Sequence, residues 1–190
     1  MDYCPIKSNF AVMKHPLDKF RYCPVCGSKR FEVNNVKSKK CQACGFTYYM
    51  NPSAATVAVI TKESGRREGL LLVVRRGKEP AKGTLDLPGG FSDMGETSEE
   101  GVAREVLEET GLRVTRTEFL FSLPNRYVYS GLEIPTMDMF YRCEIADTDG
   151  AHAMDDAADL MWIPLSEVDP SQFGLESIRL GVSKLLQMLK

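Results

Sequence analysis

Residues 89–112 read GGFSDMGETSEEGVAREVLEETGL, and this stretch decides the fold of the main part of the chain. Thr97 and Glu100 have the spacing of a capping box, which begins a helix. Gly111 suits the left-handed position that ends one. The sequence therefore predicts a helix over 97–110. Six glutamates lie in or beside it, namely Glu96, Glu99, Glu100, Glu105, Glu108 and Glu109.

Three of these glutamates are expected to gather on one side of the helix. At about 100° per residue, Glu105, Glu108 and Glu109 fall within one arc. The apolar residues assigned to roughly the opposite side are Val102, Ala103, Val106 and Leu107. A solvated acidic face is the simple alternative, because helices favour acidic residues near their N-termini. Carboxylates crowded beside a buried face repel one another, however, and Arg104 alone cannot neutralise them.

A divalent cation would relieve this repulsion. The ligand set contains only oxygen, which favours Mg²⁺ or Mn²⁺ over zinc. We therefore expect Glu105, Glu108 and Glu109, together with the backbone carbonyl of Gly89, to hold Mg²⁺. Bound there, the metal would grip a diphosphate and activate a water for in-line attack on phosphorus. The predicted activity is hydrolysis of a nucleotide diphosphate derivative.

The same stretch resembles the Nudix box. Read from Gly90, it runs G-x5-E-x7-REVLEETGL, which has the box's specified residues in order. The resemblance implies an α/β fold, an α/β/α sandwich with a mixed sheet, and a Mg²⁺-dependent pyrophosphohydrolase. It also implies that Arg104 orients the glutamates, that Glu105 is a metal ligand, and that Glu96 is a secondary ligand or a salt-bridge partner. Many members are dimers, so a homodimer stays open.

An acidic loop before Trp162 offers further groups to the site. His152, Asp155 and Asp156 are candidates for the general base, beside the glutamates of the helix. Asp156 also lies where Nudix relatives often carry an extra glutamate ligand, so the resemblance makes it a Mg²⁺ ligand with a reach one methylene shorter. The alternative for these residues is a solvated surface loop.

The segment 122–127, SLPNRY, is the expected recognition strand. It occupies the place where NADH pyrophosphatases of the Nudix family carry a Ser-Gln-Pro-Trp-Pro-Phe motif, and it keeps few residues of that motif. Phe121, Tyr127 and Tyr129 would stack on a base. Arg126 would pair with a phosphate. Packing is the alternative for the aromatic rings, of which Tyr127 and Tyr129 share one face of the strand.

Two cysteine pairs near the N-terminus predict a zinc site. Cys23-Pro-Val-Cys26 and Cys41-Gln-Ala-Cys44 are separated by fourteen residues, so that two turns can present four thiolates to one tetrahedral ion. Four protein ligands leave no open position, which makes the zinc structural; redox use is the alternative. The module resembles the zinc ribbon of certain Nudix enzymes, including NADH pyrophosphatases and relatives acting on ADP-ribose or FAD.

Charge and composition divide the chain into three parts. Residues 18–50 hold seven Lys/Arg against two Asp/Glu, whereas residues 51–190 hold fifteen against twenty-three. We expect an N-terminal extension at 1–20 that packs loosely, a zinc ribbon at 21–50 and the Nudix-like domain at 51–190. The basic ribbon leaves two alternatives open. One is a nucleotide-sensing or RNA- or protein-binding module, and the other is removal of a nucleotide cap from an RNA 5′ end.

Apolar patterning predicts the remaining elements. The expected strands are 54–61, 70–76, a short LDL strand near 85–87, 112–123, 126–130, 136–145 and 158–163, with a last helix at 175–189. The turn SGRREG would join the first two strands as a hairpin. The chain has neither an apolar run of about 18 residues nor a signal-peptide layout, so we expect a cytoplasmic protein with no membrane partner.

Overall fold

The computed structural model describes residues 15–63 and 69–188 of the chain. It divides into two compact units, Met1–Asn51 and Pro52–Lys190. Most of the predicted extension, the turn at 64–68 and the end of the predicted last helix lie outside the described residues. No helix in the described part of the chain is long and apolar enough to cross a membrane.

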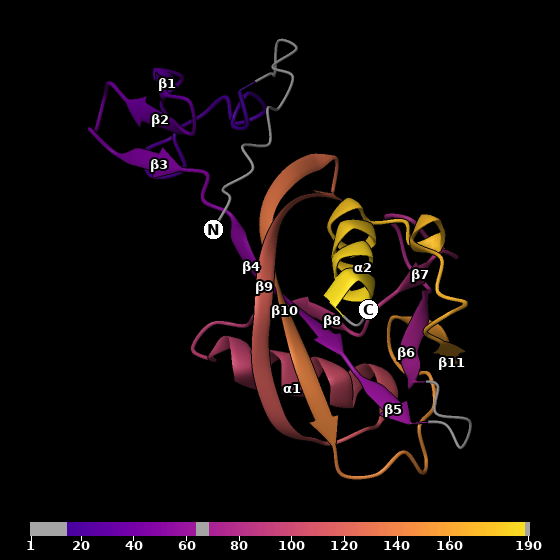
Figure 1. The fold of residues 1–190 in the computed structure, drawn as a ribbon. Helices are drawn as coiled ribbons and strands as arrows, with labels where there is room; N and C mark the ends of the chain where they lie inside the picture. Colours follow the sequence, from indigo (N-terminus) through magenta and orange to yellow (C-terminus); the bar gives the residue numbers. More distant parts are fainter. Residues whose placement is uncertain (1–14, 64–68, 189–190) are drawn as a thin grey trace. The chain divides into compact units, whose positions relative to one another are not determined.

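The first unit is a small antiparallel sheet with two cysteine turns (Figure 1). Its strands, in the order β1-β2-β3, are β1 (Phe31–Asn35), β2 (Ser38–Cys41) and β3 (Thr47–Tyr49). The buried apolar cluster of the unit is very small. It consists of Cys23, Phe31 and Cys41, with Phe20 and Phe46 packed against it. A cluster of this size cannot supply the stability of a folded unit by itself.

Residues 15–20 pack on this unit, which corrects the prediction of a loose extension for that segment. Leu17 is fully buried. The rings of Phe20 and Tyr48 are stacked with centroids 6.0 Å apart, and Lys39 Nζ donates to the carbonyl oxygen of Phe20 over 2.9 Å. The physical reason is that the unit has too little apolar surface of its own, so neighbouring apolar side chains are recruited to cover it.

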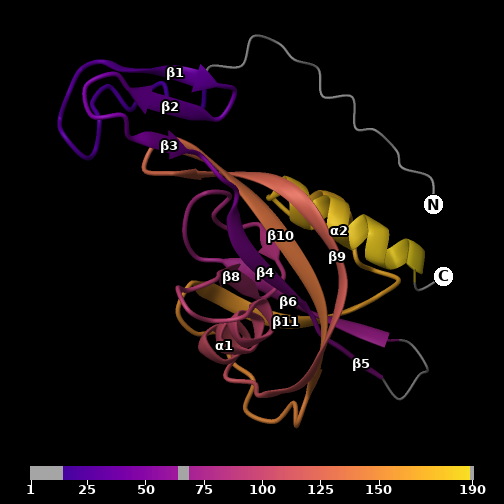
Figure 2. The same ribbon diagram turned by 90° about the vertical axis from the view of Figure 1, so that its left-hand side faces the viewer.

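The second unit contains two sheets, shown from two sides in Figures 1 and 2. The first has the order β8-β4-β10-β9 and is mixed, because β4 and β10 run parallel. Its strands are β4 (Ser53–Val59), β8 (Gly89–Phe91), β9 (Val114–Tyr129) and β10 (Leu132–Ile145). The second sheet is antiparallel and consists of β5 (Thr61–Glu63), β6 (Gly69–Arg76), β7 (Leu85–Asp86) and β11 (Ala157–Pro164).

Two predicted strand boundaries are wrong. The strand expected at 54–61 divides at Ile60, so that β4 belongs to the first sheet and β5 pairs with β6 in the second. The break expected between 123 and 126 is absent, since β9 continues through Pro124. Proline is tolerated there because β9 lies at the edge of its sheet, where one missing backbone N–H need not interrupt the ladder.

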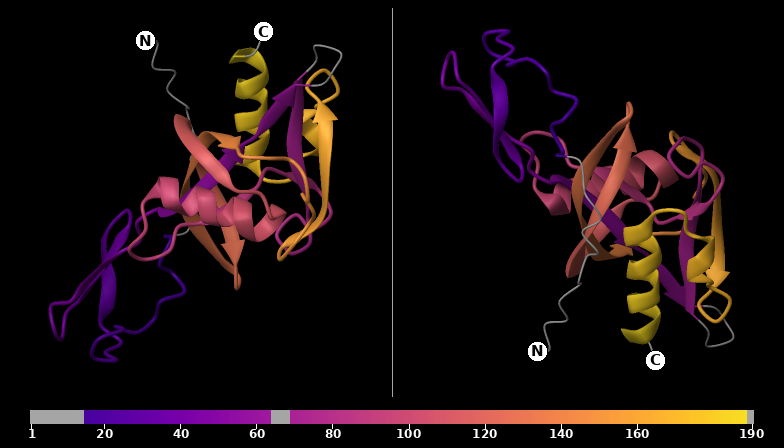
Figure 3. Two further views of the ribbon diagram at one scale, coloured as in Figure 1. Left: turned by 90° about the horizontal axis from the view of Figure 1, so that it is seen from below. Right: turned by 90° about the horizontal axis from the view of Figure 1, so that it is seen from above.

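The helices cover opposite faces of the sheets, as the views in Figure 3 show. They are α1 (Ser98–Thr110) and α2 (Glu176–Met188), with a 3-10 turn η1 (Pro170–Gln172) before α2. Alternate side chains along β4 and at Ile60, which follows it, enter two different cores. Val57 and Val59 pack in the core that contains residues of α2. Ala58 and Ile60 pack in the core that contains residues of α1. The result is the α/β/α sandwich expected from the sequence.

The helix expected from the glutamate-rich stretch is present with its predicted caps. Thr97 and Glu100 form both hydrogen bonds of the capping box, and Gly111 ends the helix with φ 73°. Val102 and Val106 are fully buried, whereas Leu107 is 39% exposed. The assignment of Leu107 to the buried face is therefore wrong, because the sheets cover a narrower part of the helix than the apolar residues span.

Candidate active site

Strand β8 lies against α1 at two glycines. A Cβ atom on Gly90 would stand only 2.5 Å from Glu105 Oε1, so the Glu105 carboxylate occupies the space of the missing side chain. The backbone N–H of Gly89 donates to Glu109 Oε2 over 3.0 Å. Gly89 has φ 153°, and a Cβ there would collide with the backbone oxygen of Thr56. Glycine at both positions therefore allows the strand to approach two carboxylates closely.

Arg104 holds the glutamates in fixed positions. Its Nη1 donates to Glu105 Oε1 and Glu108 Oε2, both over 2.9 Å. Its Nη2 and Nε donate to the two oxygens of Glu96 over 2.8 Å and 3.1 Å, and Nη2 also donates to the carbonyl of Phe91. Hydrogen bonding to Arg104 and to the Asp93 backbone lowers the pKa of Glu96 to about 2. Arg104 thus orients the cluster, but its one positive charge faces four carboxylates, those of Asp93, Glu96, Glu105 and Glu108.

Burial and mutual repulsion disfavour the charged forms of the inner glutamates. Glu109 is 8% exposed. Burial, and beyond it the charges of Asp86, Glu105 and Asp156, raise the pKa of Glu109 to about 8, although the Gly89 N–H acts in the opposite direction. Burial also raises the pKa of Glu105, against the effect of Arg104. Buried carboxylates that repel one another are stabilised as anions by a nearby cation.

The carboxylates face a cavity of about 350 Å³. Its lining combines the glutamates of α1 with residues from both sheets and from the loop before β11. The acidic and basic residues around it are Arg76, Lys78, Asp86, Asp93, Arg104, Glu105, Glu108, Glu109, Asp138, Asp155 and Asp156. Thr56 is another lining residue, and its hydroxyl is buried without a hydrogen-bond partner among the described residues. The donor set at the α1 end is all oxygen, which fits a hard divalent cation such as Mg²⁺ or Mn²⁺.

A match to a family model covers most of the chain. Residues 50–182 match the model described as NUDIX domain. The chain belongs to the Nudix family. Its fold is also that of solved Nudix proteins. A NUDIX hydrolase from Nitrosomonas europaea superposes with a TM-score of 0.67 at 20% identity, covering 88% of this chain and 90% of that one.

Two relatives carry activities in their names. The NAD-capped RNA hydrolase NudC of Vibrio parahaemolyticus is 28% identical over 159 residues, which are 82% of this chain and 55% of that protein. The ADP-ribose pyrophosphatase of Methanocaldococcus jannaschii is 35% identical over 100 residues, which are 52% of this chain and 55% of that protein. The chain spans about half the length of the curated relatives it matches.

One further structure of the Nudix fold was determined with a nucleotide. The NUDIX domain of Shewanella oneidensis NrtR, in a cocrystal with ADP ribose, superposes with a TM-score of 0.56 at 22% identity. The superposition covers 75% of this chain and 91% of that one. At this identity the likeness concerns the Nudix fold alone, so the ligand of the NrtR domain is a property of that domain.

The acidic loop of the Nudix unit divides into residues at the cavity and one beside it. Asp155 and Asp156 line the cavity. Lys78 forms ion pairs with both of these aspartates, and the charge of Asp156 contributes to the raised pKa of Glu109. His152 lies instead beside Gly111, where its Nδ1 contacts the carbonyl of Gly150 over 2.5 Å. The structure thus brings the aspartates, but not the histidine, to the carboxylate cluster.

The predicted recognition strand is only partly at the cavity. Tyr127 lines it, and its hydroxyl accepts a hydrogen bond from Arg76 over 3.3 Å. Tyr129 is 62% exposed and is not a lining residue. Arg126 alternates with Tyr127 along β9 and is exposed outside the lining. The prediction that Phe121 stacks on a base is wrong. Phe121 is 7% exposed, packs in the core and stacks on Phe140 with ring centroids 4.8 Å apart.

Sequence reasoning missed several polar residues of the cavity in the Nudix unit, among them Arg76, Asp86 and Asp138. Arg76 Nη1 and Asp86 Oδ2 form an ion pair of 2.5 Å, and Arg76 follows the apolar residues of β6. Asp138 is 4% exposed within β10 and accepts hydrogen bonds from other side chains. One feature of the sequence could have indicated both Asp86 and Asp138. Asp86 and Asp138 are charged residues placed between apolar neighbours of a strand, where an unpaired charge would be costly.

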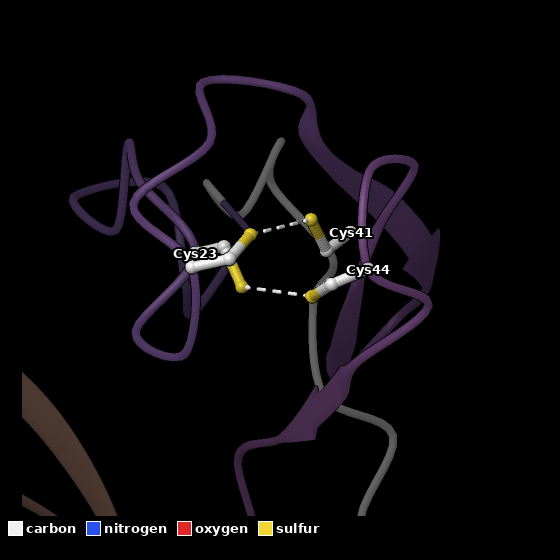
Figure 4. Close-up of side chains that lie close together, drawn as sticks. Cys23, Cys41 and Cys44 are labelled. Atoms are coloured by element: carbon white, nitrogen blue, oxygen red, sulfur yellow. Dashed lines mark hydrogen bonds between the residues drawn. The ribbon is translucent and has the colours of Figure 1, made fainter.

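The cysteines of the two CxxC pairs, Cys23, Cys26, Cys41 and Cys44, come together as the spacing predicts. Their sulfurs lie within 4.8 Å of one another. Cys23 Sγ lies 3.7 Å from Cys44 Sγ, and Cys26 Sγ lies 3.6 Å from Cys41 Sγ. Figure 4 shows the sulfurs of the two turns pointing toward one another. A tetrahedral zinc ion with Zn–S bonds of about 2.3 Å separates its sulfurs by about 3.8 Å. The sulfur spacing is therefore compatible with zinc.

Proposed function

We propose that the chain hydrolyses the diphosphate linkage of a nucleoside diphosphate derivative in a Mg²⁺-dependent reaction, with ADP-ribose, NADH and FAD as the candidate substrates. The observation that carries the proposal is the set of mutually repelling carboxylates, with Glu109 buried and Glu105 partly buried, that lines a cavity beside Gly89 and Gly90. Membership of the Nudix family and the names of the relatives support it.

Each part of the reaction has candidate residues in the cavity. Glu105, Glu108 and Glu109, with the Gly89 backbone, would hold the metal, and Asp156 is a further candidate ligand. When bound, Mg²⁺ neutralises diphosphate oxygens and lowers the pKa of a water. Arg104 keeps the carboxylates in the orientation that metal binding requires, through its hydrogen bonds to Glu96, Glu105 and Glu108.

The remaining roles concern proton transfer and the substrate. The general base would be an acidic group at the cavity, either a glutamate of α1 or one of Asp155 and Asp156. Tyr127 would contact the nucleoside through its ring. Arg126 and Tyr129, which lie outside the cavity lining, could reach only the part of a substrate that extends beyond it. The zinc of the first unit would be structural, because four thiolates leave no open position.

A specific observation favours a second candidate, removal of a nucleotide cap from RNA. Relatives are named NAD-capped RNA hydrolase, and residues 18–50 carry seven Lys/Arg against two Asp/Glu. A basic ribbon would hold the RNA strand by its phosphates, so that the same chemistry acts on a longer substrate. A nucleotide sensor that binds without hydrolysis is the remaining alternative. It has no need of carboxylates with this degree of repulsion.

The proposal is tested with a panel of substrates and matched variants. ADP-ribose, NADH, NAD, FAD, diadenosine polyphosphates and nucleoside triphosphates are assayed with and without Mg²⁺, and products are separated by chromatography. Glu105→Gln should lower kcat/KM about 100-fold or more, while Glu99→Gln, which removes an exposed charge from the same helix, should leave it unchanged. Wild-type protein that cleaves no diphosphate in the panel, or Glu105→Gln with full activity, contradicts the proposal.

Salt dependence separates the two substrate classes. If the ribbon holds RNA phosphates, kcat/KM for NAD-capped RNA should fall steeply with salt, whereas kcat/KM for free NAD should fall much less. Equal salt dependence for the two substrates would contradict an electrostatic role of the ribbon. It would leave the reaction at the carboxylate cluster untouched, since both substrates contain the same diphosphate.

A further inference from the structure

A second polar group lies in the cavity, two strands away from the glutamates. The register of the first sheet aligns Phe91 of β8, Ala55 of β4 and Asp138 of β10 in one row across the strands. Neighbouring strands are about 4.8 Å apart, so Asp138 stands roughly 10 Å from Phe91, the residue of β8 that follows Gly90. Ala55 and Asp138 both line the cavity.

Asp138 is held by three uncharged donors, and one acceptor position remains. Its Oδ2 accepts hydrogen bonds from Ser177 Oγ over 2.5 Å and from Asn125 Nδ2 over 3.1 Å. Its Oδ1 accepts one from Thr136 Oγ1 over 2.5 Å. A carboxylate oxygen has two lone pairs. Oδ2 is therefore saturated, whereas Oδ1 can accept one more hydrogen bond, and Asp138 is among the residues that line the cavity.

Asn125 presents a fixed donor and acceptor beside this carboxylate. One N–H of its amide is used by Asp138, which determines which atom of the amide is nitrogen. The second N–H and the amide oxygen are left for other partners, and Asn125 also lines the cavity. Thr56 is another lining residue, and its buried hydroxyl has no hydrogen-bond partner in the described ranges. Buried polar groups that lack a partner within the protein normally form hydrogen bonds to a water or a ligand.

Charge decides which part of a nucleotide can occupy this end. Burial, incompletely offset by Arg76, raises the pKa of Asp86, and the charge of Asp138 raises it further, so these two acids lie near each other. Arg76, the cation at this part of the lining, is paired with Asp86 and hydrogen bonded to Tyr127. Phosphate oxygens would be repelled by Asp138 and Asp86. An uncharged group that donates hydrogen bonds would not be.

We propose that Asp138 and Asn125 form the nucleoside-recognition end of the cavity, with Asp138 Oδ1 accepting a hydrogen bond from a donor on the nucleoside. The inference rests on the proposed function, which places the diphosphate at the glutamate end. One cavity is lined by both Glu105 and Asp138, so a nucleoside bound in it can extend from a diphosphate at Glu105 to a donor at Asp138. The donor is the exocyclic amino group of adenine or a hydroxyl of the ribose, since both offer the hydrogen that the carboxylate requires.

Binding measurements test the inference without relying on turnover. Calorimetry with Ca²⁺ compares the Kd of ADP with those of purine riboside 5′-diphosphate, which lacks the 6-amino group, 2′-deoxy-ADP and 3′-deoxy-ADP. The wild type should bind at least one analogue about tenfold more weakly than ADP, because the buried acceptor is then left without a partner. Weaker binding of the purine riboside analogue identifies the amino group, and weaker binding of a deoxy analogue identifies that hydroxyl.

Matched variants separate recognition from a structural role. Asp138→Asn and Asn125→Ala should each reduce the preference for ADP, over the analogue that the wild type binds most weakly, to about twofold or less. The ratio of the two Kd values is insensitive to a general loss of folded protein or of affinity, because both ligands are measured against the same variant. Ser177→Ala removes a hydrogen bond to Oδ2 on the side of α2, and it should keep the wild-type ratio. Asn125→Ala leaves the bonds of Asp138 to Ser177 and Thr136 intact, so it remains informative if Asp138→Asn does not fold.

The outcomes of this test and of the hydrolysis test are distinct. If the wild type binds ADP and all three analogues with Kd values within about twofold of one another, the inference is overturned. It is also overturned if Asp138→Asn and Asn125→Ala both keep the wild-type ratio of Kd values. Protein that discriminates through Asp138 but cleaves no diphosphate would contradict the proposed function and support a nucleotide-binding role of the same cavity. Protein that cleaves ADP-ribose but does not discriminate would contradict only the nucleoside site.

Discussion

The substitution Gly90→Ala should remove most of the activity while leaving the fold intact. The added Cβ would stand 2.5 Å from Glu105 Oε1, whereas ordinary contact begins at 3.4 Å, so the carboxylate must move by about 0.9 Å. A misplacement of about 1 Å in a catalytic group lowers the rate on the order of 100-fold. The backbone of Gly90 is not in the left-handed region. Alanine therefore adds no backbone strain, and the free energy of unfolding should change by less than about 1 kcal/mol.

A double-mutant cycle assigns this effect to Glu105. We expect kcat/KM for the best diphosphate substrate to fall about 100-fold in Gly90→Ala and at least as far in Glu105→Gln. The double variant should be no worse than the poorer single variant, because both changes act on the same carboxylate. Urea unfolding of each variant provides the control for stability. Full activity in Gly90→Ala, or losses that multiply in the double variant, would refute the account of this contact.

Three further predictions concern other parts of the chain. Gly181→Ala places a Cβ against the ring of Phe140, so urea unfolding should show a loss of about 1–3 kcal/mol; a stability equal to wild type would contradict the close packing of α2. Burial raises the pKa of the Cys143 thiol to about 12. Cys143 should therefore resist a thiol reagent at about pH 8 until the protein unfolds. Fast labelling of Cys143 in the native protein would argue against its burial. A strong chelator should release one zinc per chain and unfold the first unit, whereas the transition of the Nudix unit should persist; a first unit that stays folded without metal would contradict the structural role.

The sequence was most informative at positions where a residue type serves one local physical purpose. The capping box at Thr97 and the glycine at position 111 set both ends of α1, and each depends only on local hydrogen bonds and backbone conformation. The cysteine turns were predictable for a similar reason, because four thiolates at this spacing have few alternatives to one shared ion. The carboxylate cluster followed from helical periodicity, which places Glu105 and Glu109 on one side.

Features set by long-range packing were not predictable from one sequence. Phe121 and Tyr127 are aromatic residues of the same strand, yet Phe121 is in the core and Tyr127 lines the cavity, a difference made by α2 and the neighbouring strands. Pro124 suggested a break, but it is tolerated because β9 is an edge strand, which depends on the order of the sheet. Asp138 became a candidate only when its partners Asn125 and Ser177, distant in sequence, were seen beside it.

The central claim is that the carboxylates of α1 share divalent cations with a bound diphosphate. The most direct measurement is a crystal structure with Mg²⁺ and a non-hydrolysable methylene analogue of ADP-ribose. The account predicts electron density for Mg²⁺ within about 2.1 Å of oxygens of Glu105 and Glu109, with the analogue's phosphate groups completing the coordination. Mg²⁺ absent from these carboxylates, with the analogue bound elsewhere on the protein, would contradict it.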